Sequence, residues 1–361
     1  MEGRSLAEEA ALGMGDPNMT HRERVIRTIE RREVDFPASW LGMPIKDALP
    51  GLFDFFQVTD IVALKTRIND DLFCVDIPYQ SPIASHIAWA FDFAKSGPKD
   101  TSESTLTTPG YFADVESVGE VDAFSWPDPR KHIDPEQCRR SVDAAPEDYA
   151  VMVAAWSIHY EATCAAFGME TALIRMMTEP TLFQAVMRKI LDFYLEANSI
   201  FYDAVGDKID IVLIGNDLGT QRGLLLGPEQ IRKYILPGTK ELVQQAHSRG
   251  YKVMHHSCGS IVEIIPDLIE IGVDIIHPIQ ALAYGMEPEK LQAEFGNSIS
   301  FCGGVDAQNL LVNGNPAEVS ETVRQLRSIF PTGLIISPSH EAILKDTKPE
   351  NIEALFDAVH Q

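Results

Sequence analysis

The sequence lacks the long apolar runs that would place it across a membrane. No stretch reaches about 18 consecutive apolar residues, and residues 1–18 hold no apolar segment behind a basic start. Basic residues are also scarce, with 30 lysines and arginines against 53 aspartates and glutamates and a formal net charge of -23. A nucleic-acid backbone or an anionic membrane surface would repel this chain, so neither is an expected partner. We expect a cytoplasmic protein.

Cysteine is sparse, and the glycine-rich phosphate motifs are absent. The five cysteines are scattered and odd in number, which does not fit a disulfide framework and favours a reducing compartment. We expect structural roles for Cys74, Cys164 and Cys302, the last inside an apolar run. No G-x-G-x-x-G or G-x-x-x-x-G-K run occurs, so the usual signature of a nucleotide-binding, doubly wound sheet is missing.

From about residue 150 onward, short apolar runs alternate with segments of helical period, a pattern typical of strand–helix units around a parallel sheet. The predicted strands are Val151–Trp156, Ile209–Ile214, Tyr251–Met254, Val273–His277, Ile299–Cys302 and Leu334–Ile336. The predicted helices are Pro180–Val205, Pro228–Arg249, Ile261–Ile271, Pro288–Phe295, Pro316–Phe330 and Pro349–Val359, several of which begin with proline.

The fold class that follows is α/β, a (β/α)8 TIM barrel with N-terminal insertions, and a doubly wound open sheet is the alternative. The segment Ser96–Pro129 is rich in glycine, proline, serine and threonine, which predicts loop and hairpin. Residues 1–18 are expected to form a disordered extension, and residues 19–361 a single barrel domain. The basic run His21–Arg32 is expected to be helical.

Polar side chains follow several of the predicted strands, where a barrel places its active site. The most informative pair is His256 and Cys258, one residue apart just beyond an apolar run, because alternate residues of an extended segment point the same way. His340 follows the last predicted strand. Two imidazoles and one thiolate with a position left open make a catalytic zinc set, so His256, Cys258 and His340 are the predicted zinc ligands.

Other polar residues at predicted strand ends have competing interpretations. Asp217 and Asp306 are candidate catalytic carboxylates, although Asp306 equally suits a helix N-cap. His277 fits best as a hydrogen-bonded core histidine, with a substrate contact as the alternative. Asn216 and Gln221 are the other candidate substrate contacts.

Four blocks of the chain together resemble the uroporphyrinogen decarboxylase superfamily. They are Gly215 to Gln221, His256 to Ser260, Gly303 to Asp306, and Ser337 to His340 with Thr347, Pro349, Glu350 and Asn351. The likeness extends from about Thr20 to the C-terminus and implies a (β/α)8 barrel, in agreement with the strand and helix pattern.

The resemblance implies one of two chemistries. Uroporphyrinogen decarboxylases use no metal and grip their substrate's carboxylates with an arginine-rich N-terminal signature, yet residues 34–44 hold no arginine. The cobalamin-dependent methyltransferases of the superfamily share the H-x-C zinc ligands, here His256 and Cys258, and have a cysteine where this chain has His340.

We therefore expect a zinc-dependent methyltransferase that moves a methyl group between a corrinoid protein and a small-molecule acceptor. No D-x-H-x-x-G run is present, so the corrinoid (cobalamin) would come on a partner protein. The alternatives are a metal-free decarboxylase, in which Asp217 or Asp306 stabilises a protonated ring, and a non-catalytic protein that binds a corrinoid or small molecule.

Overall fold

A curled parallel sheet forms the centre of the molecule in the computed structural model, which describes residues 19–91, 93 and 108–361. Its seven strands are β2 (Leu72–Asp76), β3 (Ala150–Trp156), β4 (Ile211–Gly215), β7 (Lys252–His256), β8 (Ile275–Ile279), β9 (Ser300–Val305) and β10 (Leu334–Pro338). Neighbours in the sheet follow chain order from β2 to β10, and all pairs are parallel. A doubly wound sheet would reverse its strand order part-way, so this order excludes the alternative architecture.

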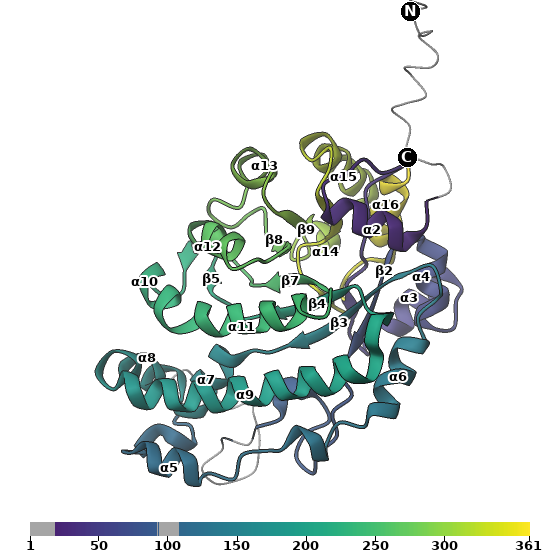
Figure 1. The fold of residues 1–361 in the computed structure, drawn as a ribbon. Coiled ribbons are helices and arrows are strands. Elements are labelled where there is room, and N and C mark those ends of the chain that lie inside the picture. Colours follow the sequence, from purple (N-terminus) through teal and green to yellow (C-terminus); the bar gives the residue numbers. More distant parts are fainter. Residues whose placement is uncertain (1–18, 92, 94–107) are drawn as a thin grey trace, which may run out of the picture.

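The helices lie outside the curled sheet (Figure 1). They are α2 (His21–Ile29), α3 (Leu49–Phe56), α4 (Ile61–Ile68), α5 (Val118–Ala123), α6 (Pro135–Asp143), α7 (His159–Phe167), α8 (Met169–Thr178), α9 (Pro180–Val205), α10 (Pro228–Gln230), α11 (Leu236–His247), α12 (Ile265–Glu270), α13 (Pro288–Phe295), α14 (Leu310–Asn313), α15 (Pro316–Ile329) and α16 (Pro349–Val359). The predicted bounds of α9, α13 and α16 are confirmed, each with proline in the first turn. Short pairs β1 (Met43–Pro44) with β11 (Ala342–Ile343), and β5 (Gly219–Thr220) with β6 (Gly223–Leu224), complete the strands.

The predicted eight-stranded barrel is confirmed only in part, because the sheet is not closed by an eighth ladder. Between β10 and β2 lies the segment 38–41, which makes a single parallel bridge, Ser39 with Ile336. On its other side, the N–H groups of Ser39 and Leu41 donate to the carboxylates of Asp71 and Asp70 at 2.8 and 2.7 Å. Side-chain oxygens thus accept bonds that a neighbouring strand's carbonyls would accept in a ladder.

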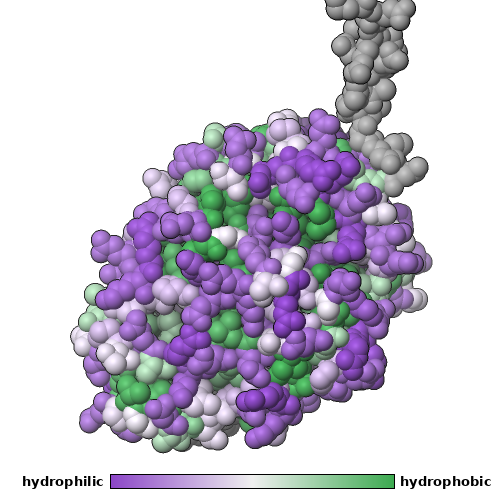
Figure 2. Space-filling view, viewed as in Figure 1, coloured by the Kyte–Doolittle hydropathy of each residue, from purple (hydrophilic) through white to green (hydrophobic). Residues whose placement is uncertain are grey.

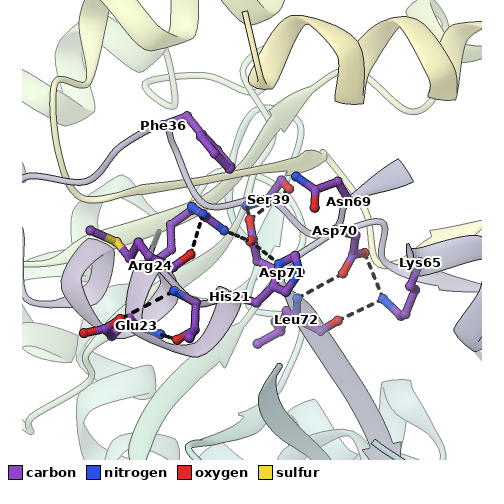
Figure 3. Close-up of polar contacts among 12 residues, drawn as sticks. His21, Glu23, Arg24, Phe36, Ser39, Lys65, Asn69, Asp70, Asp71 and Leu72 are labelled. Carbon is purple, nitrogen blue, oxygen red and sulfur yellow. Dashed lines mark hydrogen bonds and ion pairs between the residues drawn. The ribbon is translucent and has the colours of Figure 1, made fainter. Parts of the chain in front are cut away.

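A buried ionic cluster holds these two carboxylates in place (Figure 3). Arg24 pairs with both Asp71 and Asp35, and Lys65 donates to Asp70 at 2.8 Å. The side chains of Arg24, Lys65, Asp70 and Asp71 are at most 4% exposed. The cluster lies at the amino end of β2, where a barrel places stabilising rather than catalytic residues.

Apolar side chains fill the inside of the curled sheet. They include Trp40, Leu72, Ala150, Met152, Ala154, Ile211, Leu213, Met254, Ile275, Cys302 and Ile335. The interior is therefore a packed core rather than a pore. Cys302 is fully buried, as its place in an apolar run predicts, and all five cysteines are free.

The N-terminal part of the chain departs most from the prediction. Residues 1–18, the predicted extension, and residues 96–107 of the predicted loop and hairpin lie outside the described residues. Residues 108–129 form short helical turns and α5, with no strand. None of the helices in the described part of the chain combines the length and apolar character needed to span a bilayer. The face in Figure 2 is largely hydrophilic, with apolar patches separated by polar residues.

Candidate metal centre

The carboxyl ends of β4, β7, β8 and β10 bring histidine, cysteine and carboxylate side chains together. His256 is the last residue of β7, and its Nε2 lies 3.7 Å from the sulfur of Cys258. The same Nε2 lies 3.4 Å from Oδ1 of Asp217, which follows β4. The ligand atoms of Asp217, His256 and Cys258 all lie within 4.8 Å of one another.

These three donors fit a zinc ion by their spacing and by their chemistry. Tetrahedral zinc at its usual bond lengths sets an N···S edge of about 3.6 Å and an N···O edge of about 3.4 Å. The distances of 3.7 Å and 3.4 Å from His256 Nε2 match these edges. Imidazole with thiolate is also the ligand combination that zinc prefers over magnesium or calcium.

His340 borders this group from the loop after β10. The nearby Cys258 side chain raises the pKa of the imidazole, an effect that burial opposes and the charge of Glu341 reinforces. Its Nδ1 accepts the N–H of Ala342 at 3.0 Å. The ring centroids of His340 and His256 are 6.4 Å apart. The predicted ligands His256, Cys258 and His340 are therefore neighbours, but they do not form one set of donors within 4.8 Å.

The other side of the His256 ring meets a second set of polar groups. Its Nδ1 lies 2.9 Å from Nδ1 of His277 and 3.6 Å from Oε2 of Glu341. His277 is fully buried and packs against the Trp40 ring at a centroid distance of 5.2 Å. Its burial and its hydrogen-bond contact with His256 agree with the interpretation of His277 as a hydrogen-bonded core histidine. Burial and the charges of His256 and His340 lower its pKa well below the ordinary value.

The electrostatics of the group favour ionised ligands. Burial raises the pKa of the Cys258 thiol, but the neighbouring imidazoles of His256 and His340 outweigh burial and leave that pKa below its usual value. Burial likewise disfavours ionised Asp217, yet its hydrogen bond and charge pairing with His256 hold the pKa at about 2. Burial opposes protonation of His256, but Asp217 and Cys258 raise its pKa well above the ordinary value. A thiolate and a carboxylate are the forms that bind metal, with the proton of His256 released on binding.

Glu161 is a carboxyl group of this site that the sequence interpretation missed. It lies in the first turn of α7 and accepts the N–H of Asp217 at 2.5 Å. Burial, with added repulsion from Asp217 and Glu341, raises its pKa to about 7. The sequence could have indicated Glu161, because it is a carboxyl residue only five positions after the last residue of β3, where a barrel places its active site. Glu341, next to His340, was missed in the same way.

Three predicted site residues use their side chains to hold the loops around the site. Asn216 is buried, and its Oδ1 accepts the N–H of Tyr160 at 2.9 Å, which fixes the start of α7. Gln221 donates to Gln280 at 3.2 Å. Asp306 accepts backbone N–H groups of residues 308–310 at 3.0 to 3.2 Å and so holds the turn before α14, whose N-cap is Asn309 rather than Asp306. Their roles in substrate binding or catalysis stay predictions.

Trp156 forms part of the wall of the site. Its ring lies 5.9 Å from that of His256, and its buried Nε1 has no hydrogen-bond partner among the described residues. Trp156 and Ser157 both have φ of 55°, in the left-handed region that bulky residues rarely adopt. Strain of this kind persists where surrounding contacts enforce it, often at functional sites.

Comparisons with known proteins point to one family. The family model described as uroporphyrinogen decarboxylase (URO-D) matches residues 110–361. No curated protein matches the chain. A solved structure, a methyltransferase from Methanosarcina mazei, is similar over 95% of this chain and 98% of that one, with a TM-score of 0.66 and 14% identity. A putative vitamin-B12 independent methionine synthase from Listeria monocytogenes is similar over 62% of this chain and 67% of that one, with a TM-score of 0.36 and 14% identity.

Proposed function

We propose that this chain, which belongs to the uroporphyrinogen decarboxylase (URO-D) family, is a zinc-dependent methyltransferase. The observation that carries the proposal is the His256 and Cys258 pair, whose donor atoms are spaced for one zinc ion. The fold shared with the Methanosarcina mazei methyltransferase is consistent with it. The absence of arginine from residues 34–44 removes the positive charge that a substrate with many carboxylates would need.

In this proposal, His256 and Cys258 hold the metal together with a third residue from a neighbouring loop, for which the sequence predicts His340. Bound zinc would lower the pKa of an acceptor thiol or hydroxyl, so that the acceptor is an anion near neutral pH. That anion attacks an electrophilic methyl group and forms a new S–C or O–C bond, while the bond from the methyl group to its donor breaks.

Two carboxyl groups of the chain, Asp217 and Glu161, have different roles in this proposal. Asp217, with a pKa of about 2, stays ionised and suits charge stabilisation or ligation. Glu161, with a pKa of about 7, has the proton affinity expected of a general base that takes the proton from the acceptor thiol or hydroxyl. Trp156 covers one side of the centre and restricts water beside His256.

The methyl group would come from, or go to, a corrinoid carried by a partner protein. Two features of the sequence support a corrinoid on a partner: the chain lacks the D-x-H-x-x-G run that would let it carry a corrinoid itself, and it has the H-x-C pair of the corrinoid-dependent methyltransferases. Methylcobalamin is a convenient small surrogate for that partner.

Elemental analysis with a methyl-transfer assay tests the proposal. We expect about one zinc per chain and zinc-dependent demethylation of methylcobalamin by a panel of thiols, with both lost in His256→Ala. A wild-type protein that binds no zinc, and a His256→Ala variant with unchanged activity, would reject this function.

Metal-free decarboxylation is the second candidate, because the matching family model carries that description. Here His340 and Asp217 would act on the substrate directly. Release of carbon dioxide from a porphyrinogen by zinc-free protein would favour this candidate over methyl transfer.

A further inference from the structure

We propose that Asp217, rather than His340, is the third protein ligand of the metal that His256 and Cys258 bind, and that His340 donates a hydrogen bond to the Cys258 sulfur. This assignment rests on the zinc binding proposed above. It changes the donor set from two imidazoles and a thiolate to one imidazole, one thiolate and one carboxylate.

The positions of the donor atoms support Asp217. In the described part of the chain, two donor sets have all atoms within 4.8 Å, namely Asp217 with His256 and Cys258, and His256 with His277 and Glu341. His340 belongs to neither. Two imidazoles on one tetrahedral zinc would bring their ring centres to about 5 Å, whereas the rings of His256 and His340 are 6.4 Å apart.

The Asp217 side chain is held beside Cys258 by hydrogen bonds to the backbone, so it is not free to rotate. Its Oδ1 accepts the Cys258 N–H at 2.8 Å. Around it the loops 216–220 and 257–260 interlock, because Leu218 N–H donates to the Ser257 hydroxyl at 2.9 Å and Ser260 N–H donates to the Thr220 carbonyl at 2.8 Å. The carboxylate is therefore preorganised for the metal, which lowers the cost of ordering it on binding.

The glycines of these two loops show how close they lie. A Cβ on Gly219 would stand 2.6 Å from the Cys258 carbonyl oxygen, and one on Gly259 would stand 2.7 Å from the Thr220 N and O atoms. The two backbones lie so close together that a residue with a side chain would not fit in place of either glycine. The spacing between Asp217 and Cys258 is thus a property of the backbone.

His340 is placed as a donor to sulfur rather than as a ligand. Its Nδ1 accepts the Ala342 N–H at 3.0 Å, so the proton of the neutral ring sits on Nε2. In this assignment, Nε2 is then the nitrogen left to donate to the Cys258 sulfur. Ligation through Nε2 would require the proton to move to Nδ1, where the Ala342 N–H already points.

The two donor sets differ in net charge. A divalent ion with the thiolate of Cys258 and the carboxylate of Asp217 forms a neutral centre, whereas His340 in place of Asp217 leaves one positive charge. The N–H of His340 withdraws charge from the sulfur, which offsets part of the electron donation from the extra anionic ligand.

Zinc affinity separates the two assignments. The full chain is purified as wild type, Asp217→Asn, His340→Gln and, as a matched acid-to-amide control that belongs to neither donor set, Asp267→Asn. Asparagine keeps an oxygen for the Cys258 N–H but ligates zinc poorly. Zinc affinity is measured by competition with a chromogenic chelator, and thiolate ligation by the charge-transfer absorption of the Co²⁺-substituted protein. Circular dichroism of the zinc-free proteins confirms that each variant is folded.

We expect Asp217→Asn to weaken zinc binding on the order of 100-fold or more, whereas His340→Gln weakens it by about tenfold and shifts the cobalt–thiolate band. Asp267→Asn should match the wild type. Zinc lost from His340→Gln but retained by Asp217→Asn would overturn the assignment and leave the proposed function standing. A wild type that binds no zinc would overturn both.

Discussion

Replacing Arg24 by methionine tests whether the buried ionic cluster holds segment 38–41 in the gap of the sheet. The Arg24 side chain is 4% exposed and pairs with Asp71, which is fully buried. Methionine has similar bulk but no charge, so the Asp71 carboxylate would keep His21 and the hydrogen bonds of Ser39 as its partners in the described part of the chain. Removing one partner of a buried ion pair costs about 3–5 kcal/mol.

The expected loss can be converted into a melting temperature. Unfolding entropy of about 2.1 cal/mol/K per residue over 361 residues gives about 0.8 kcal/mol/K, so Arg24→Met should lower Tm by about 4–7 °C. Urea unfolding with an unchanged slope measures the same loss at constant temperature.

The matched control lies on the same helix. Arg22 also pairs with an aspartate, Asp210, whose side chain is 6% exposed, but the Arg22 side chain is 56% exposed, so water can replace the guanidinium. Arg22→Met should therefore cost less than Arg24→Met, about 1–2 kcal/mol. The double variant Arg24→Met with Asp71→Asn should lose less stability than the sum of the two single variants. The Asp71→Asn change removes the carboxylate charge that Arg24→Met leaves without its partner. A cost below about 1 kcal/mol for Arg24→Met, or strict additivity, would refute the reasoning.

Three further changes have defined outcomes. Burial disfavours ionised Asp35, but its hydrogen bonds with Arg24 outweigh burial and lower its pKa below 3.8, so its contribution to stability is present above that pH and lost as the pH falls through the folded-state pKa. Asp35→Asn should thus be less stable than wild type at neutral pH in urea unfolding, with the difference shrinking as the pH falls below 3.8; a pH-independent difference would contradict this. Gly219→Ala would place its Cβ 2.6 Å from a backbone carbonyl, whereas Gly51→Ala meets nothing within 4 Å. The first should cost about 1–3 kcal/mol and weaken zinc binding, while the second should change stability by about 1 kcal/mol or less, both by urea unfolding and chelator competition; equal effects would argue against interlocked loops. Because the Trp156 ring lies 5.9 Å from that of His256, zinc should change the tryptophan fluorescence of the wild type and not that of Trp156→Phe, and an unchanged response in the variant would place the reporter elsewhere.

The second half of the fold was predictable because hydrophobic periodicity and proline placement agree there. The run Pro180–Val205 has an unbroken helical period, and it forms α9 with those bounds. The first half was not, because its elements depend on distant partners. Strand β2 follows Asp70 and Asp71, two charges that look like a loop until Lys65 and Arg24 neutralise them. Segment 38–41 bonds to the backbone of Ile336 and Asp71, but its Ser39 and Leu41 N–H groups donate to side chains, which no periodicity reveals.

The site was partly predictable for a related reason. Ligand-type residues just beyond apolar runs point to a strand end, and that argument finds His256, Cys258 and Asp217. It does not say which carboxylates ligate and which cap, because aspartate serves both purposes after a strand. Glu161 became part of the site only through the packing of α7 against the loop after β4.

The 2.9 Å contact between the Nδ1 atoms of His256 and His277 accommodates one shared proton, because two N–H groups cannot point at each other. That proton belongs to His256, whose pKa is raised, rather than to His277, whose pKa is lowered. His277 accepts it through Nδ1 and, as a neutral ring, carries its own proton on Nε2, which has no partner among the described residues. A neutral His256 that donates from Nδ1 keeps its free lone pair on Nε2, so this buried pair fixes the tautomer in which the nitrogen beside Asp217 and Cys258 is the one that can bind a metal.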